Sequence, residues 1–161
     1  MFFTAGKAGA WAPAFRYPAH TKEGENKMEK KEILTIDVQV QGVFELKGTV
    51  GEVSMVPFDG TCETEYFRGK VMAGGVDTQM TWYPDPKMIS ARYMLIGTDC
   101  AGKACRIFVE NNGAEINGRV EETKPRIITD SEALSWFETA RLTGTLTPTD
   151  SGVTVRIFAE C

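Results

Sequence analysis

One short stretch of the chain, residues 73–83, combines residue types that can build a small-molecule site. The glycine pair Gly74-Gly75 precedes the carboxylate of Asp77, the amide of Gln79 and the indole of Trp82. A carboxylate in a half-buried strand is costly unless it is hydrogen-bonded or faces water. If Asp77 lines an apolar pocket, its pKa should be raised, and it could bind a ligand hydroxyl or amine or transfer protons. The alternative is that Asp77 points outward or caps the glycine turn.

Strand alternation divides the side chains of this region between two faces. Asp77 and Gln79 fall on one face and Trp82 on the other, so Asp77 and Trp82 can share a cavity only if a bulge intervenes. Arg92 and Tyr93 are adjacent in a later strand pattern, and at most one of them should line the interior. Tyr93 is either a core tyrosine or a phenol that donates to a ligand. Arg92 is either a surface residue or an anchor for a ligand carboxylate.

An aromatic pair near the end of the chain, Trp136-Phe137, is predicted to plug one end of the fold, with a lid over a ligand as the alternative. Asp77 is the single catalytic candidate. The candidate ligand-binding residues are Asp77, Gln79, Trp82, Arg92, Tyr93 and Trp136.

Several chemistries are excluded by the residues that the chain lacks. The only histidine, His20, lies in the first 27 residues, so residues 28–161 cannot supply a Ser-His-Asp triad, a Cys-His pair or a histidine-based zinc site. No Gly-Lys-Ser/Thr motif follows the glycine pair, as a phosphate-binding loop would require. We therefore expect neither a metal nor a cofactor. The four cysteines lack zinc or redox spacing and are predicted to be packing residues or bystanders: Cys62, Cys100, Cys105 and Cys161.

The length and the net charge of the chain are those of one acidic domain. The chain has 161 residues and a formal net charge of −4, which disfavours a general nucleic-acid binder. No apolar run approaches the roughly 18 residues that a membrane helix needs. Lys7 interrupts the apolar start before a signal-peptide core develops, so we expect a cytoplasmic protein.

The first 27 residues differ in kind from the rest, because they show no periodicity of strand or helix. They are predicted to be a disordered tail or a translated leader, with Met28 as the biological start. The second interpretation rests on Lys22-Glu23-Gly24, which a purine-rich ribosome-binding sequence can encode. Residues 28–161 then form the folded domain.

From Ile33 onward the chain alternates apolar and polar residues in about eight or nine short segments, which predicts an all-β fold. Their regular spacing favours a single antiparallel up-and-down β-barrel, with a sandwich as the alternative. Asp59-Gly60 is predicted to be a hairpin turn, Asn111-Asn112-Gly113 another turn, and residues 114–126 a surface loop. One short helix is expected near residues 130–137, because Thr129 and Glu132 have capping-box spacing.

Several of these motifs resemble a mainly microbial family, domain of unknown function 3237, over roughly residues 33–161. The motifs are Gly74-Gly75-Val76-Asp77, Tyr93, Gly97-Thr98-Asp99, Gly102, Asn112-Gly113 and the aromatic-rich stretch 136–144. The chain departs from the family pattern at Ala73, where proline is expected, and at Gln79, which follows Asp77 without an aromatic between them. The resemblance implies a lipocalin-like (calycin) barrel with a central cavity and brings no established activity.

Three functions fit these observations. The leading hypothesis is a barrel that binds a small apolar or weakly acidic ligand in an apolar cavity with a few polar groups, Asp77 among them. The second is a cofactor-independent isomerase, cyclase or hydratase that uses Asp77 as acid or base. The third is an interaction domain with a filled barrel. Self-association is compatible with all three, and no residue specifies its symmetry.

Overall fold

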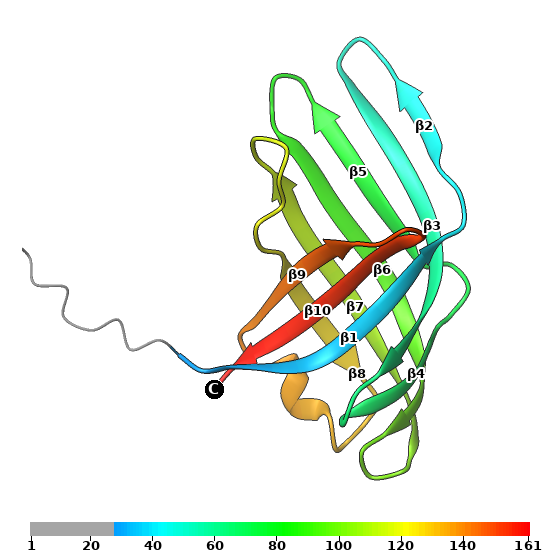
Figure 1. The fold of residues 1–161 in the computed structure, drawn as a ribbon, viewed down its shortest axis with the longest axis vertical. Helices are drawn as coiled ribbons and strands as arrows, with labels where there is room; N and C mark the ends of the chain where they lie inside the picture. The colour runs from blue at the N-terminus through cyan, green and yellow to red at the C-terminus, as the bar shows by residue number, and fades with distance from the viewer. Residues whose placement is uncertain (1–27) are drawn as a thin grey trace, which may run out of the picture.

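The computed structural model of the protein describes residues 28–161, which form one antiparallel sheet that curls into a barrel (Figure 1). The predictions for residues 1–27, including those that concern His20, lie outside the described residues. The strands are β1 (Lys30–Val40), β2 (Phe44–Lys47), β3 (Gly51–Glu63), β4 (Phe67–Val71), β5 (Val76–Trp82), β6 (Lys87–Asp99), β7 (Ala104–Glu115), β8 (Lys124–Thr129), β9 (Leu142–Pro148) and β10 (Gly152–Glu160).

The ten strands occupy eight positions around the barrel. β1 and β2 follow one another along a single position, and so do β4 and β5. β1 pairs with the second half of β3 and β2 with its first half. In the same way β4 and β5 both lie between β3 and β6. Gly42 lies in the first interruption and Gly74 in the second, where its φ of 102° is one that glycine adopts without strain. The predicted all-β antiparallel class is confirmed, with ten strands instead of eight or nine.

The barrel closes through a single bridge. β8 and β9 do not pair along their length; the backbones of Thr123 and Gly144 exchange two hydrogen bonds of 2.9 Å between the residue before β8 and the third residue of β9. A side chain at position 144 would collide with Thr123 Oγ1. Glycine therefore permits the close approach that joins the two ends of the sheet.

Alternation in the strands produces the core. On β1, Leu34, Ile36 and Val38 point inward and are buried, as their spacing predicts. Ile33 is also fully buried, because the register with β10 shifts between Glu32 and Leu34 and places two consecutive side chains inside.

Four local predictions are wrong. The predicted surface loop at residues 114–126 is shorter, because residues 114–115 belong to β7 and residues 124–126 to β8. Asp59-Gly60 is not a turn but lies inside β3, where a side chain on Gly60 would collide with the backbone of β1. The turn expected at Asn111-Asn112-Gly113 is absent, because β7 runs through it to Glu115. The predicted capping box does not form either.

The one short helix of residues 28–161 is the 3-10 helix η1 (Ser135–Glu138), at the end of the barrel opposite the β2–β3 hairpin (Figure 1). The Glu138 carboxylate accepts a hydrogen bond from the backbone of Thr129 instead of a capping box forming there. No helix of the described residues is long and apolar enough to cross a membrane.

Candidate functional site

The barrel interior contains a cavity of about 230 Å³. Drug-sized ligands occupy pockets of roughly 300–1,000 Å³, so this cavity suits a smaller molecule. Seven strands contribute to its wall. The lining residues are Val38, Val40, Val56, Phe58, Asp77, Gln79, Ile89, Ala91, Tyr93, Asn111, Thr123, Leu146, Gly152, Val153 and Val155.

Four buried polar atoms of this wall lack a hydrogen-bond partner. They are Asp77 Oδ1, Tyr93 OH, Asn111 Oδ1 and Thr123 Oγ1, and no other buried side-chain oxygen or nitrogen of residues 28–161 is left unpartnered. Buried polar groups in native proteins are nearly always hydrogen-bonded, because an unpartnered one costs about 1–3 kcal/mol. The residues that carry these four atoms all line one cavity, so a molecule bound there is placed to complete their hydrogen bonds.

Asp77 is half-buried on β5, between Val56 of β3 and Ala91 of β6. The Gln79 side chain lies two residues along the same face, and its Nε2 donates to Asp77 Oδ2 at 2.9 Å. Burial raises the pKa of the Asp77 carboxyl above its ordinary value of 3.8, and the hydrogen bond from Gln79 acts in the opposite direction. One carboxyl oxygen is thus held in place, while the other is buried without a hydrogen-bond partner.

A row of three residues across β5, β6 and β7 forms the polar wall. Asp77 pairs with Ala91, and Ala91 pairs with Asn111. Two strand spacings separate Asp77 from Asn111, or about 10 Å between their Cα atoms. The methyl group of Ala91 leaves open space between the carboxyl and the amide.

Tyr93 follows Ala91 on the same inner face of β6. It is only 4% exposed, and its ring packs edge-on against Phe58 with 5.3 Å between centroids. Burial raises the pKa of the Tyr93 hydroxyl well above its ordinary value of 10.0, with a smaller contribution from Cys62. The phenol is therefore neutral at physiological pH and able to donate a hydrogen bond into the cavity.

No lysine or arginine of residues 28–161 lines the cavity. Arg92 points outward and pairs with Glu110 at 3.0 Å. Arg106 pairs with Asp130 and Arg141 with Glu160, each at 3.0 Å. The cavity thus presents carboxyl, hydroxyl and amide groups and apolar side chains without a positive charge.

Of the six residues that the sequence singles out, the structure brings three together: Asp77, Gln79 and Tyr93. Trp82 is 59% exposed on the outer face of β5, as alternation predicts in the absence of a bulge. Arg92 lies outside for the same reason. Trp136 packs against Phe137 and Tyr66, with centroid distances of 4.7 and 5.8 Å, and does not line the cavity.

Sequence reasoning missed Asn111 and Thr123. The sequence predicts a turn at Asn111, although this residue continues the inward alternation of Cys105, Ile107 and Val109, which is the signal that places it inside. The sequence predicts a surface loop around Thr123, and no local pattern shows that this residue reaches the interior at the bridge to Gly144.

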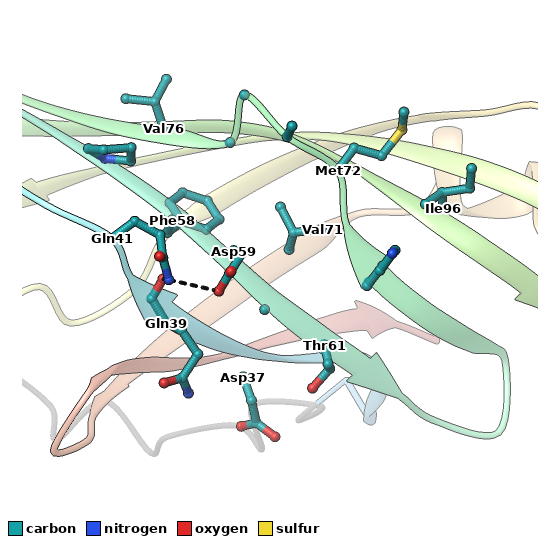
Figure 2. A pocket seen from close by; sticks show the side chains of 16 residues that line it. Asp37, Gln39, Gln41, Phe58, Asp59, Thr61, Val71, Met72, Val76 and Ile96 are labelled. Carbon is teal, nitrogen blue, oxygen red and sulfur yellow. Dashed lines mark hydrogen bonds between the residues drawn. The ribbon is translucent and has the colours of Figure 1, made fainter.

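A second hollow, of about 870 Å³, lies on the outer surface where β1, β3 and the β4–β5 connection meet (Figure 2). Figure 2 shows Gln41 donating to Asp59 there, at 3.1 Å. Its polar side chains, such as Asp37 and Gln39, are exposed to water, and none of the four unpartnered buried atoms lines it. The smaller inner cavity is therefore the better candidate site.

Metal ligands do not gather in the described part of the chain: no three His, Cys, Asp or Glu side chains of residues 28–161 lie in an arrangement that could hold an ion.

Solved structures share this fold, although no family model and no curated protein matches the chain. A protein of unknown function from Clostridium acetobutylicum is 21% identical with a TM-score of 0.71, over 83% of this chain and 100% of that one. A β-barrel-like protein from Acinetobacter baumannii is 17% identical with a TM-score of 0.66, over 81% and 94%. An enzyme from Penicillium herquei is 12% identical with a TM-score of 0.64, over 83% and 94%. Identities this low show a common fold and nothing about activity.

Proposed function

We propose that this protein binds a small molecule inside its barrel, in the cavity lined by Asp77, Tyr93, Asn111 and Thr123. The observation that carries the proposal is the convergence of four unpartnered buried polar atoms on one cavity of about 230 Å³. A barrel that served only as an interaction domain would be expected to fill this space with side chains, as the rest of its core does.

The polar and apolar groups that line the cavity limit which ligands can bind there. Asp77 Oδ1 and Asn111 Oδ1 are acceptors, so the ligand should carry hydrogen-bond donors, such as hydroxyl or amine groups. The remaining wall is largely apolar, with Phe58 and Ile89 among its residues. Since no cationic side chain is present, a carboxylate or phosphate ligand is disfavoured. A neutral, weakly acidic hydroxyl such as a phenol fits best.

A second candidate function is proton transfer on the bound molecule. Asp77 lines the cavity and combines a raised pKa with an unpartnered carboxyl oxygen, and Tyr93 supplies a neutral donor. This pair could move a proton to or from a ligand in an isomerisation, cyclisation or hydration. The similar structure from Penicillium herquei is of an enzyme, which shows that a barrel of this kind can serve an enzyme.

The test is a thermal-shift and calorimetric screen of the full chain against small phenols and primary amines, with Ala91→Leu as the cavity-filled control. Ligands should stabilise the wild type and leave Ala91→Leu unaffected. Equal responses of the two proteins, or none in the wild type together with no co-purified molecule detected by mass spectrometry, would refute the proposal.

Asp77→Asn then separates the two functions. Retained affinity with lost turnover of the bound compound indicates an enzyme, whereas lost affinity with no turnover in either protein indicates a binder. The lipocalin-like (calycin) class, membership of the domain of unknown function 3237 family and a cytoplasmic location stay predictions.

A further inference from the structure

The strand β2 is a free edge of the sheet. It pairs with β3 alone, and no strand of the described residues lies along its other side (Figure 1). All four of its residues are exposed, including Phe44 at 69% and Leu46 at 70%. An unpaired edge strand can pair with another chain, and β2 presents an apolar face formed by Phe44 and Leu46.

The hairpin that joins β2 to β3 shows which backbone groups are free. The Gly48 N–H donates to the Gly51 carbonyl at 2.9 Å. Hydrogen-bonded and non-hydrogen-bonded pairs alternate along an antiparallel ladder, so the hydrogen-bonded residues of β2 are Leu46 and Phe44, opposite Val53 and Met55. The N–H and C=O groups of Glu45 and Lys47 therefore point away from β3 and toward the free edge.

Charge selects one register for a second copy on this edge. Two antiparallel β2 strands related by a twofold axis must place outward-pointing residues opposite each other. An axis through Leu46 sets Glu45 of each copy opposite Lys47 of the other, which gives two pairs of opposite charge. An axis through Glu45 or Lys47 would oppose like charges, which destabilises a cross-strand pair.

The apolar side chains of β2, on the outer face of the barrel, are also compatible with a twofold axis through Leu46. Leu46 lies in a row of apolar side chains on the outer face of the barrel, with Val53, Met80 and Met88 of the neighbouring strands. Leu46 of the two copies would meet at the axis, with Phe44 on either side. The row would then continue from one copy into the next, so that the exposed Leu46 becomes partly buried.

We propose that two copies of this chain associate by antiparallel pairing of their β2 strands, with Leu46 on the twofold axis and Glu45 opposite Lys47. The paired segment is short, so the dimer is weak and forms only at high protein concentration. The inference is independent of the ligand cavity.

Sedimentation velocity of the full chain over a wide concentration range tests the dimer. Glu45→Lys and Lys47→Glu each replace two attractive pairs by two repulsive ones and should weaken dimerisation about tenfold or more. The double variant Glu45→Lys/Lys47→Glu restores both intermolecular pairs and should recover most of the wild-type affinity, while it also removes the ion pair of 3.7 Å between Lys47 and Glu52 within the hairpin. Glu63→Lys, an exposed change of equal charge on β3, serves as the matched control and should have no effect.

Amide hydrogen exchange supplies a readout at the level of single residues. The N–H groups of Glu45 and Lys47 should become more protected as the protein concentration rises, whereas that of Leu46 should change much less. A wild type that stays monomeric, a double variant as weak as the single ones, or concentration-independent exchange at Glu45 and Lys47 would each overturn the proposal.

Discussion

Asp77 on β5 and Asn111 on β7 are both cross-strand neighbours of Ala91, which stands between them on β6. Each contributes an unpartnered oxygen to the same cavity. The small side chain of Ala91 therefore separates the two residues that carry these acceptors. A ligand hydroxyl or amine would donate to one of these oxygens, and the room for the ligand depends on the size of residue 91.

Replacing Ala91 by leucine should abolish ligand binding without unfolding the barrel. The added carbons enter the cavity between Asp77 and Asn111, so the free energy of unfolding should change by no more than about 2 kcal/mol. Isothermal calorimetry and urea denaturation measure the two effects. Ser90→Leu adds the same bulk on the outer face of β6 and should leave binding intact; if it also abolishes binding, the effect is not that of cavity filling.

The stability of Asp77→Asn relative to the wild type should depend on pH. Burial raises the pKa of the Asp77 carboxyl in the folded state above its ordinary value of 3.8. The stability that the protonated carboxyl contributes is fully present below about that pH and is lost as the pH rises through the raised value. Asp77→Asn should therefore gain stability over the wild type as the pH increases from 4 to 7. Urea denaturation at several pH values measures this, and a pH-independent difference would contradict the burial of the charge.

Removing the hydroxyl of Tyr93 should not destabilise the ligand-free protein. The OH group is buried without a partner, so Tyr93→Phe relieves an unsatisfied donor while the ring keeps its edge-on contact with Phe58. We expect the free energy of unfolding to stay level or rise by about 1 kcal/mol, and ligand affinity to fall about tenfold. Chemical denaturation of both proteins, stripped of ligand, checks the first part. A loss of stability would mean that the hydroxyl is already hydrogen-bonded, for example by water.

Gly144→Ala should weaken the closure of the barrel. The new methyl group would collide with Thr123 Oγ1 at the only bridge between β8 and β9 in the described residues. Overpacking of this kind costs about 1–3 kcal/mol. Thr123→Ala removes the colliding atom, so the double variant should recover most of the lost stability. Thermal unfolding of the wild type, the two single variants and the double variant forms a double-mutant cycle. If the stability changes of the two single variants simply add in the double variant, the strain does not come from contact between residues 144 and 123.

The four cysteines should divide into two classes of reactivity. Cys62 and Cys105 are buried, whereas Cys100 and Cys161 are exposed. Burial also raises the pKa of the Cys62 thiol to about 12, which suppresses its reactive thiolate. A thiol reagent at pH 8 should therefore label Cys100 and Cys161 rapidly, and Cys62 and Cys105 only after unfolding. Peptide mapping by mass spectrometry identifies the sites, and rapid labelling of Cys62 would show that the core is open.

Several properties of this protein follow from the sequence alone, because they depend on the alternation of residues within one strand. Alternation predicted the all-β class, the inward face of β1, and the separation of Asp77 from Trp82 and of Tyr93 from Arg92. The confinement of histidine to the first 27 residues also needs no structure. These inferences hold because a strand has a period of two whatever its neighbours are.

Alternation within a strand does not show which strands lie side by side or in which register they pair, so only the tertiary structure decided these features. Asn111 becomes a cavity residue only because β7 continues through a sequence typical of a turn, held there by its pairing with β6 and β8. Thr123 reaches the interior only because Gly144 lets the two ends of the sheet meet. Pairing between distant segments is stabilised by the whole barrel, so it overrides local turn preference. The sequence therefore singled out Asp77 as a candidate, and the fold decided that Asn111 and Thr123 line the same cavity.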